Sequence, residues 1–219
     1  MGTVDTSPNS TRFATGTGDS DEASIWSITT GKRLVGPLQY DSPVMGIKFS
    51  PNGEHIATAC RHGSVIHVFD SHSGDRLIDI KTIIPSSPPI TPLTWSNNGE
   101  WIFATSDDNK IKCFDVSTGS RLAESPTLSG GTTKSITLAA DGRFFATYAH
   151  RSISFLDALT LTRIGPVIED SEDIGSIALS PDSNYLATGR RDGKFSVRKL
   201  SNILPELYGG LFHVSICTF

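Results

Sequence analysis

The sequence has few cysteines and no long apolar run. Its three cysteines, Cys60, Cys113 and Cys217, are an odd number and lie far apart, which is typical of buried thiols in a reducing compartment rather than of a disulfide framework. No apolar stretch approaches the roughly 18 residues that a membrane helix needs, and the start, MGTVDTSPNS, does not resemble a secretory signal. These absences predict a cytoplasmic chain with no membrane partner.

Strong charge of either sign and a sustained helical period are missing as well. The 19 Lys and Arg and 23 Asp and Glu give a formal net charge of −4, which gives no reason to expect a nucleic-acid partner. With 37% hydrophobic and 19% charged residues, the 219-residue chain can bury a core. Because no 3.6-residue apolar period of useful length is present, we expect strands rather than helices.

The chain does contain one short sequence motif, here called the phrase, that occurs five times. SPNSTRFATG (7–16) recurs in related form at 50–59, 96–106, 139–148 and 180–189. Each copy joins a turn sequence to an Ala-Thr pair, and successive pairs lie about 41 to 47 residues apart, close to the period of a β-propeller blade. This spacing indicates a repeat array.

Each repeat predicts four antiparallel strands. Before the phrase, apolar residues alternate with others, as Ile47 and Phe49 do in VMGIKFS, which is typical of a half-buried strand. The turn leads into the Ala-Thr strand, a third alternating segment such as Ile66 and Val68 follows, and a second turn leads to a short fourth strand. The repeats occupy residues 1–200, with blades at about 2–38, 44–80, 91–128, 134–168 and 174–200.

Two segments depart from this pattern. TIIPSSPPITP (82–92) is expected to form a long loop between blades two and three, because proline cannot donate to a strand ladder. Residues 201–219 carry no turn-and-Ala-Thr phrase. We expect either an irregular C-terminal tail there or a last strand for blade five, supplied by HVSICTF (213–219).

Over roughly residues 2–200, the repeats resemble WD40 repeats. That family has a Ser-Pro-Asp-Gly-like turn, a Leu-Ala-Ser/Thr-Gly strand, an Asp in the next turn and a Trp-Asp ending the third strand; SPDSNYLATG (180–189) carries the turn and the strand. The resemblance implies an all-β propeller, with about five four-stranded antiparallel blades, that acts as a protein-interaction platform. Closed propellers typically have about four to eight blades, so five imply either a small closed ring or an incomplete, open array.

The resemblance also implies a buried hydrogen-bonded network of His, Asp, Ser/Thr and Trp in each blade. By position, the Ser/Thr site is filled in every repeat, the Asp site holds Asp only in blades one and five, and the Trp site holds Trp only in blade one. The His is absent from every repeat, so we expect blades held mainly by apolar packing. The network residues are Thr15, Asp19, Trp26, Thr58, Thr105, Thr147, Thr188 and Asp192.

No pattern of catalytic or metal-binding residues emerges from the sequence. His62, His67 and His72 follow one another along an expected strand at about 16 Å, too far apart to share a zinc ion. SGGTTKS (129–135) lacks the two glycines that a phosphate-binding loop requires and precedes a strand. No Gly-x-Ser-x-Gly elbow is present. We therefore expect no enzymatic activity, no metal and no cofactor.

Surface charge is the remaining candidate for function. In WD40-like propellers the turns between second and third strands share one face with the inter-blade loops. In this chain those turns are acidic in blades one and three and mainly basic in the others, an arrangement that can orient a partner, although turns that merely face water look similar. The candidate contacts are Asp19, Asp21, Glu22, Arg61, His62, Asp107, Asp108, Lys110, His150, Arg151, Arg190, Arg191 and Asp192.

Two functional hypotheses follow. The preferred one is a non-catalytic scaffold that presents propeller loops to a protein or peptide partner. The alternative is a truncated or degenerate fragment of a larger WD40 protein, such as the C-terminal sensor array of a signalling NTPase. If the array is open, unpaired blade edges and an apolar tail favour self-association.

Overall fold

A computed structural model describes residues 2–17, 21–60, 65–82 and 92–208. Within these ranges the chain forms five antiparallel sheets, which we call blades one to five in chain order. Blade one contains β1 (Thr3–Thr6), β2 (Arg12–Gly16), β3 (Glu22–Ser27) and β4 (Arg33–Gln39). Blade two contains β5 (Val44–Phe49), β6 (His55–Cys60), β7 (Val65–Asp70) and β8 (Arg76–Lys81). Blade three contains β9 (Leu93–Trp95), β10 (Trp101–Thr105), β11 (Ile111–Asp115) and β12 (Arg121–Glu124). Blade four contains β13 (Ser135–Leu138), β14 (Phe144–Ala149), β15 (Ser152–Asp157) and β16 (Arg163–Glu169), and blade five contains β17 (Ile174–Leu179), β18 (Tyr185–Arg190) and β19 (Phe195–Lys199).

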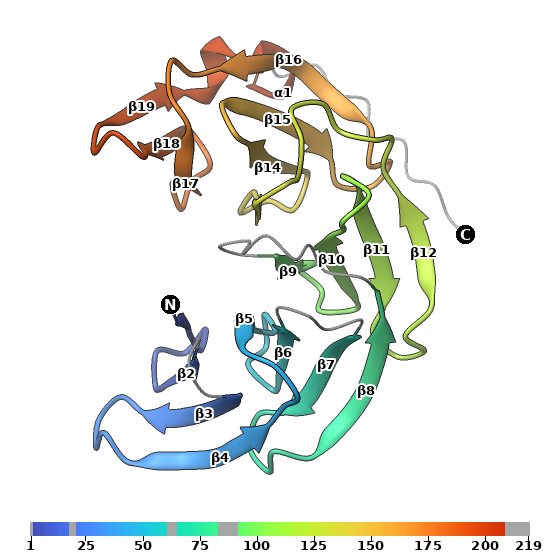
Figure 1. Cartoon of the computed structure of the whole chain (residues 1–219), viewed down its shortest axis with the longest axis vertical. Coiled ribbons are helices and arrows are strands. Elements are labelled where there is room, and N and C mark those ends of the chain that lie inside the picture. The colour runs from blue at the N-terminus through green and yellow to red at the C-terminus, as the bar shows by residue number, and fades with distance from the viewer. Residues whose placement is uncertain (1, 18–20, 61–64, 83–91, 209–219) are drawn as a thin grey trace.

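The blades are meanders arranged around an open arc. In every sheet the hydrogen-bonded neighbours are consecutive in the sequence. Strands such as β5 and β9 lie on the inner side of the arc, and β4, β8 and β12 lie on the outer side (Figure 1). Blades one and five stand at the two ends of the arc, on either side of its opening (Figure 1). The predicted all-β propeller architecture is confirmed, and within the described residues the blades form an open arc (Figure 1). Blade five departs from the predicted four strands, because its described part has three.

The repeated turn phrase closes the first hairpin of a blade. In blade two, Ser50 Oγ accepts a hydrogen bond from the backbone N–H of His55 at 2.9 Å and donates to Asn52 Oδ1 at 2.7 Å. Gly53 lies at φ +76°, a left-handed conformation that glycine adopts without a steric penalty. The same serine-to-backbone bond recurs, also at 2.9 Å, at Ser7, Ser96 and Ser180. The phrase is thus repeated because each hairpin needs the same turn.

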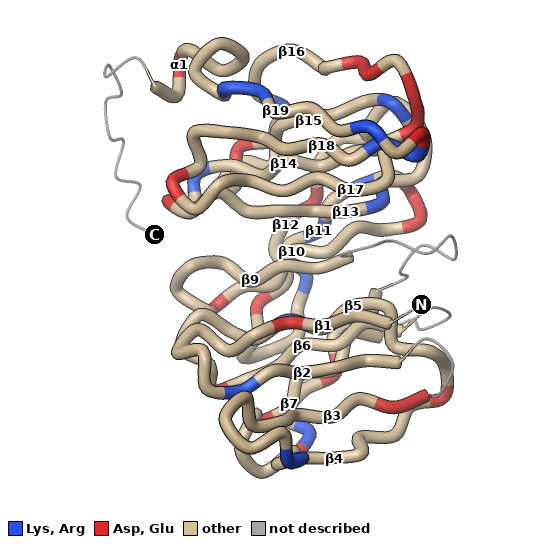
Figure 2. The backbone as a smooth tube through the Cα atoms, turned by 90° about the vertical axis from the view of Figure 1, so that its left-hand side faces the viewer, with Lys and Arg blue, Asp and Glu red and all other residues tan. Residues whose placement is uncertain are grey.

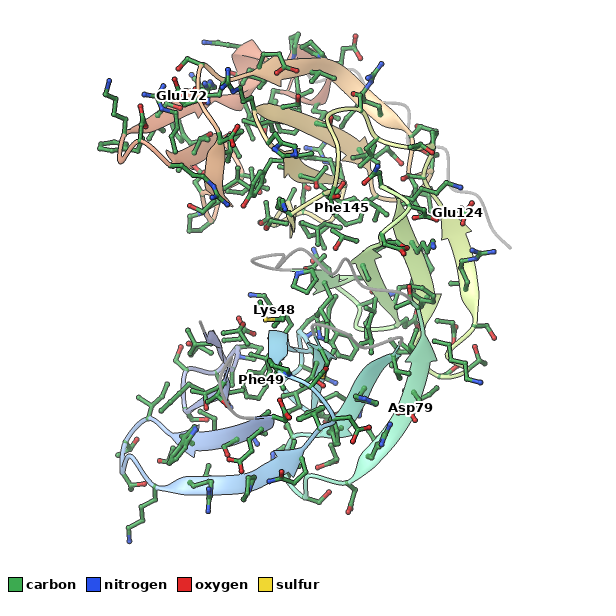
Figure 3. The ribbon with its side chains drawn as sticks, in the orientation of Figure 1. Lys48, Phe49, Asp79, Glu124, Phe145 and Glu172 are labelled. Carbon is green, nitrogen blue, oxygen red and sulfur yellow. The ribbon has the colours of Figure 1, made fainter. Side chains whose placement is uncertain are left out.

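The core lies between the blades. The alanines of the phrase in blades one to four, among them Ala57, are fully buried, because a small side chain lets the next sheet approach closely. Between blades three and four, the rings of Phe103 and Phe145 meet edge to face with centroids 4.5 Å apart (Figure 3). Between blades one and two, Lys48 Nζ forms an ion pair with Asp5 Oδ1 at 2.7 Å.

The chain turns helical after β19. A 3₁₀-helix, η1 (Leu200–Asn202), and a short helix, α1 (Pro205–Tyr208), follow directly. Leu200 and Leu204 are buried against Phe144 and Phe155 of blade four. The expected irregular tail is therefore packed in its first part, while residues 209–219, with the strand predicted at 213–219, lie outside the described residues. No helix in the described part of the chain is long and apolar enough to cross a membrane.

Candidate functional site

The described second-to-third-strand turns, those of blades three, four and five, and the described inter-blade loops gather along one side of the arc, which we call the turn face (Figure 2). Of the predicted contacts, Asp19, Arg61 and His62 lie outside the described residues. In blade one, Glu22 Oε1 accepts a hydrogen bond from Gln39 Nε2 at 3.1 Å, and Asp21 is half-buried beside it. The acidic charge predicted for blade one is thus partly engaged within its own sheet.

The charges of blade three pair with one another. Lys110 Nζ lies 2.5 Å from Oε1 of Glu124 on the outer strand β12 (Figure 3), and Lys112 Nζ lies 2.9 Å from Asp108 Oδ2. Asp107 is exposed beside them. The blade-three turn therefore presents fewer unpaired charges to a partner than its sequence indicates.

In blade five, Arg190 is part of a buried ion-pair network. Its guanidinium lies 3.3 Å from Asp170 Oδ1 and 2.8 Å from Asp192 Oδ2, and its side chain is only 16% exposed. Asp170 is 4% exposed and also pairs with Arg198 Nη2 at 2.9 Å. Burial by itself raises the pKa of Asp170, but hydrogen bonds from Arg198, the backbone of Ser171 and Arg190 outweigh it and hold that pKa below its usual value. Arg190 thus stabilises the fold and is not an open contact.

The acidic loop between β16 and β17 is a part of the turn face that the sequence analysis missed. Arg151 Nε lies 3.5 Å from Asp173 Oδ1, and its Nη2 lies 4.0 Å from Glu172 Oε2. Both carboxylates and the Arg151 guanidinium are about half-exposed. The acidic run EDSED (169–173) is visible in the sequence, but it belongs to an inter-blade loop rather than to a turn within a blade. The surface of blades four and five is consequently mixed in charge rather than basic.

Backbone hydrogen bonds join this loop to the turns on both sides of it. The N–H groups of Asp170 and Ile174 donate to the carbonyls of Arg151 and His150, each at 2.8 Å. The N–H of Arg191 donates to the carbonyl of Asp173, also at 2.8 Å. Three segments that are distant in the sequence therefore form one connected surface.

The predicted network positions of blades one and five form their hydrogen bonds with different side chains. In blade one, Trp26 Nε1 donates to Thr15 Oγ1 at 2.9 Å. In blade five, Arg198 occupies the Trp position, and its Nη1 donates to Thr188 Oγ1 at 3.1 Å while its Nη2 pairs with Asp170. A guanidinium and a carboxylate thus replace an indole between blades four and five.

The family model described as WD domain, G-beta repeat matches residues 32–70, 63–115 and 163–197, which together are more than half of the chain. The chain belongs to the WD40-repeat family. It is 24% identical to eukaryotic translation initiation factor 3 subunit I of Aspergillus terreus, over 94% of this chain and 68% of that protein. It is 26% identical to the subunit I of Scheffersomyces stipitis, over 94% of this chain and 67% of that protein. The small ribosomal subunit protein RACK1 of Caenorhabditis elegans is 31% identical over 53% of this chain and 37% of its own length.

The other threonines of the WD40 pattern bond to backbone carbonyls. Thr147 Oγ1 donates to Ser135 O at 2.6 Å, and Thr58 Oγ1 donates to His67 O at 3.4 Å. Thr105 Oγ1 donates to Pro92 O at 3.4 Å. Thr147 and Thr58 thus link adjacent strands, whereas the strand register places Ala104, and not the predicted Thr105, at the position that Thr58 has in blade two. At the Trp positions, Phe69, Phe114 and Leu156 are buried.

In the described part of this WD40 chain, the thiols are buried and the histidine–carboxylate contact belongs to a surface ion-pair group. Within the described residues, no group of three or more His, Cys, Asp and Glu side chains could hold a metal ion. Burial raises the pKa of both Cys60 and Cys113 to about 11, so each thiol stays protonated at neutral pH. His67 Nδ1 lies 2.8 Å from Asp79 Oδ1, but Asp79 is also held by Arg76 at 2.6 Å, as part of a surface ion-pair group. Among the described residues, these groups therefore do not converge on one site.

Proposed function

We propose that this WD40 chain is a non-catalytic scaffold that binds a protein or peptide through the turn face of blades four and five. The observation that carries the proposal is the connected surface made by the β14–β15 turn, the β16–β17 loop and the β18–β19 turn. A surface whose segments are already fixed loses little conformational entropy when a partner binds. This favours a role in recognition.

Two cationic side chains of this surface are exposed on a turn whose backbone is fixed. Asp192 fixes the β18–β19 turn by pairing with Arg190 and by accepting the N–H of Lys194 at 3.1 Å. Arg191 is exposed on that turn, and the Lys194 side chain is 75% exposed although its Nζ lies 4.0 Å from Asp192 Oδ2. Exposed charges on a fixed turn can steer a partner of complementary charge and increase its association rate. With acidic side chains close by, the surface suits a segment that carries charges of both signs.

A comparison of captured partners tests this proposal. The chain would be used as bait in a lysate of its source cells, in three forms: wild type, Arg191→Glu/Lys194→Glu, and the control Lys32→Glu/Lys81→Glu. Both double variants change the net charge equally, but Lys32 and Lys81 are exposed on blades one and two. We expect chemically cross-linked partners to be lost only with the first double variant. Equal recovery of the same partners in all three forms would exclude this face as the contact.

A second candidate is more specific: a protein subunit of a translation assembly. It is supported by the relatives named as a subunit of initiation factor 3, whose matches span 94% of this chain. Sucrose-gradient sedimentation of a source-cell lysate checks it, because assembly with small ribosomal subunits or with initiation factor 3 would move the chain into fast fractions. Recovery of all the chain in light fractions, under cross-linking, would reject this candidate. The cytoplasmic location and the absence of direct nucleic-acid or membrane partners remain parts of the proposal.

A further inference from the structure

Each blade has two apolar faces, one toward the next blade and one toward the preceding blade, which we call its forward and backward faces. In blade two the forward face includes Ala57, Ala59, Ile66 and Val68, all fully buried. They cluster with side chains of blade three, among them Phe114. The interface thus packs apolar side chains of one backward face against an apolar forward face whose β6 residues, Ala57 and Ala59, are small.

Blade five exposes the forward face that the other blades bury. Ala187 pairs with Val197, and Gly189 pairs with Phe195, in the register that Ala57 and Ala59 have with Val68 and Ile66 in blade two. Phe195 is 81% exposed and Val197 is 59% exposed. A surface of this composition is normally found inside an interface.

Blade one exposes the matching backward face. Val4, Phe13 and Trp26 occupy the register positions that Ile47, Ile56 and Phe69 have in blade two, where they are packed against blade one. Val4 is 65% exposed, and the Phe13 and Trp26 rings lie nearly parallel with centroids 6.3 Å apart. Trp26 of blade one corresponds in register to Phe114 of blade three and Phe13 to Ile102. Ala187 and Gly189 of blade five correspond to Ala57 and Ala59.

From this complementarity we propose that the chain associates head to tail with a second copy of itself. The forward face of blade five in one copy packs on the backward face of blade one in the next, and so repeats the interface that each copy already contains between its own blades. Within one copy the two faces stand at opposite ends of the arc and cannot cover each other (Figure 1). A heterologous contact of this kind adds copies one after another instead of stopping at a symmetric dimer.

Paired variants test the proposal in a way that a nonspecific apolar contact cannot mimic. Phe195→Glu removes only the forward face and Val4→Glu removes only the backward face, while Leu159→Glu changes a side chain that is 66% exposed elsewhere, on blade four. Molar mass would be measured by light scattering after size exclusion, over about 1 to 100 µM, because association depends on concentration. We expect the wild type and Leu159→Glu to grow beyond dimers, and each of the other two variants alone to stay monomeric.

Mixing the two monomeric variants is the decisive step. Phe195→Glu keeps an intact backward face and Val4→Glu keeps an intact forward face, so an equal mixture should form dimers and nothing larger. A monomeric wild type at all concentrations, or a mixture that stays monomeric, would overturn the proposal. Association of Val4→Glu alone would also overturn it, because it would mean that two forward faces meet. If thermal melting shows that Phe195→Glu is unfolded, Val197→Lys replaces it in the same scheme.

Discussion

Replacing Asp170 with alanine should loosen blade five from blade four. Asp170 follows β16 directly, and its side chain is almost fully buried. It forms ion pairs with Arg190 at 3.3 Å and with Arg198 at 2.9 Å. Arg198 belongs to β19 and Arg190 to the end of β18, so one carboxylate holds two strands of blade five. Without it, Arg198 keeps only its hydrogen bonds to hydroxyl groups.

The size of the effect follows from the burial of the three groups. Removing one partner of a fully buried ion pair costs about 3 to 5 kcal/mol, whereas exposed pairs contribute about 0 to 1 kcal/mol. The Arg190 and Arg198 side chains are 16% and 26% exposed, so water recovers part of the loss. We expect Asp170→Ala to lower the free energy of unfolding by about 2 to 3 kcal/mol, which corresponds to a decrease in Tm of about 4 to 12 °C.

Calorimetry and hydrogen exchange measure this loss and locate it. Exchange should accelerate in β17–β19 and not in blade one, because repeat arrays open locally. Asp170→Ala/Arg198→Met should recover part of the stability, since the unpaired charge is gone. Because the pKa of Asp170 is lower in the folded than in the unfolded chain, its contribution is present at neutral pH and is lost as the pH falls below about 4. An unchanged Tm with unchanged exchange in β17–β19 would refute the reasoning.

Three further predictions concern packing, turns and thiols. Ala57→Leu should lower the free energy of unfolding by about 1 to 3 kcal/mol, because it overpacks a closed interface between blades. Ala187→Leu, on the open face of blade five, should change it by less than about 0.5 kcal/mol in denaturant titrations of the monomeric protein. Similar losses in both variants would contradict the assignment of buried and open faces. Ser50→Ala should cost about 0.5 to 1.5 kcal/mol in the same assay through loss of its turn hydrogen bonds, and no loss would mean that the turn does not depend on the serine. Cys60 and Cys113 should react with a thiol reagent at pH 8 only slowly until the chain unfolds, because burial raises both pKa values to about 11. Rapid labelling of either of these two residues in the folded chain would disprove its burial.

The blades could be predicted from the sequence because they follow local rules. The strand in VMGIKFS, the turn after it and the small Ala57 each depend on residues a few positions apart, and the structure places all three where the sequence predicts them. The predicted half-burial of that strand is wrong, because neighbouring blades cover both of its faces. The Ala-Thr phrase is equally legible in blade five. This phrase could not predict that Ala187 is exposed, because exposure depends on whether a neighbouring sheet covers the blade and not on the sequence of the blade itself.

The candidate site was less predictable because its contacts are distant in the sequence. A charge in a turn looks the same whether it is open, like Arg191, or paired, like Arg190. Asp170 and Arg198 come from different blades, and no local pattern links them. The helix α1 did have a local signal, Pro205 at its first position with Glu206 after it, but it is only one turn long and its stability comes from packing on blade four.

Binding through the turn face is tested most directly by titrating the captured partner, once purified, into wild type, Arg191→Glu/Lys194→Glu and Lys32→Glu/Lys81→Glu at two salt concentrations. We predict a Kd at least about tenfold weaker for the Arg191→Glu/Lys194→Glu variant, with little change for the Lys32→Glu/Lys81→Glu control and with wild-type binding that weakens as salt increases. The same Kd and the same salt dependence in all three proteins would contradict a partner site on blades four and five.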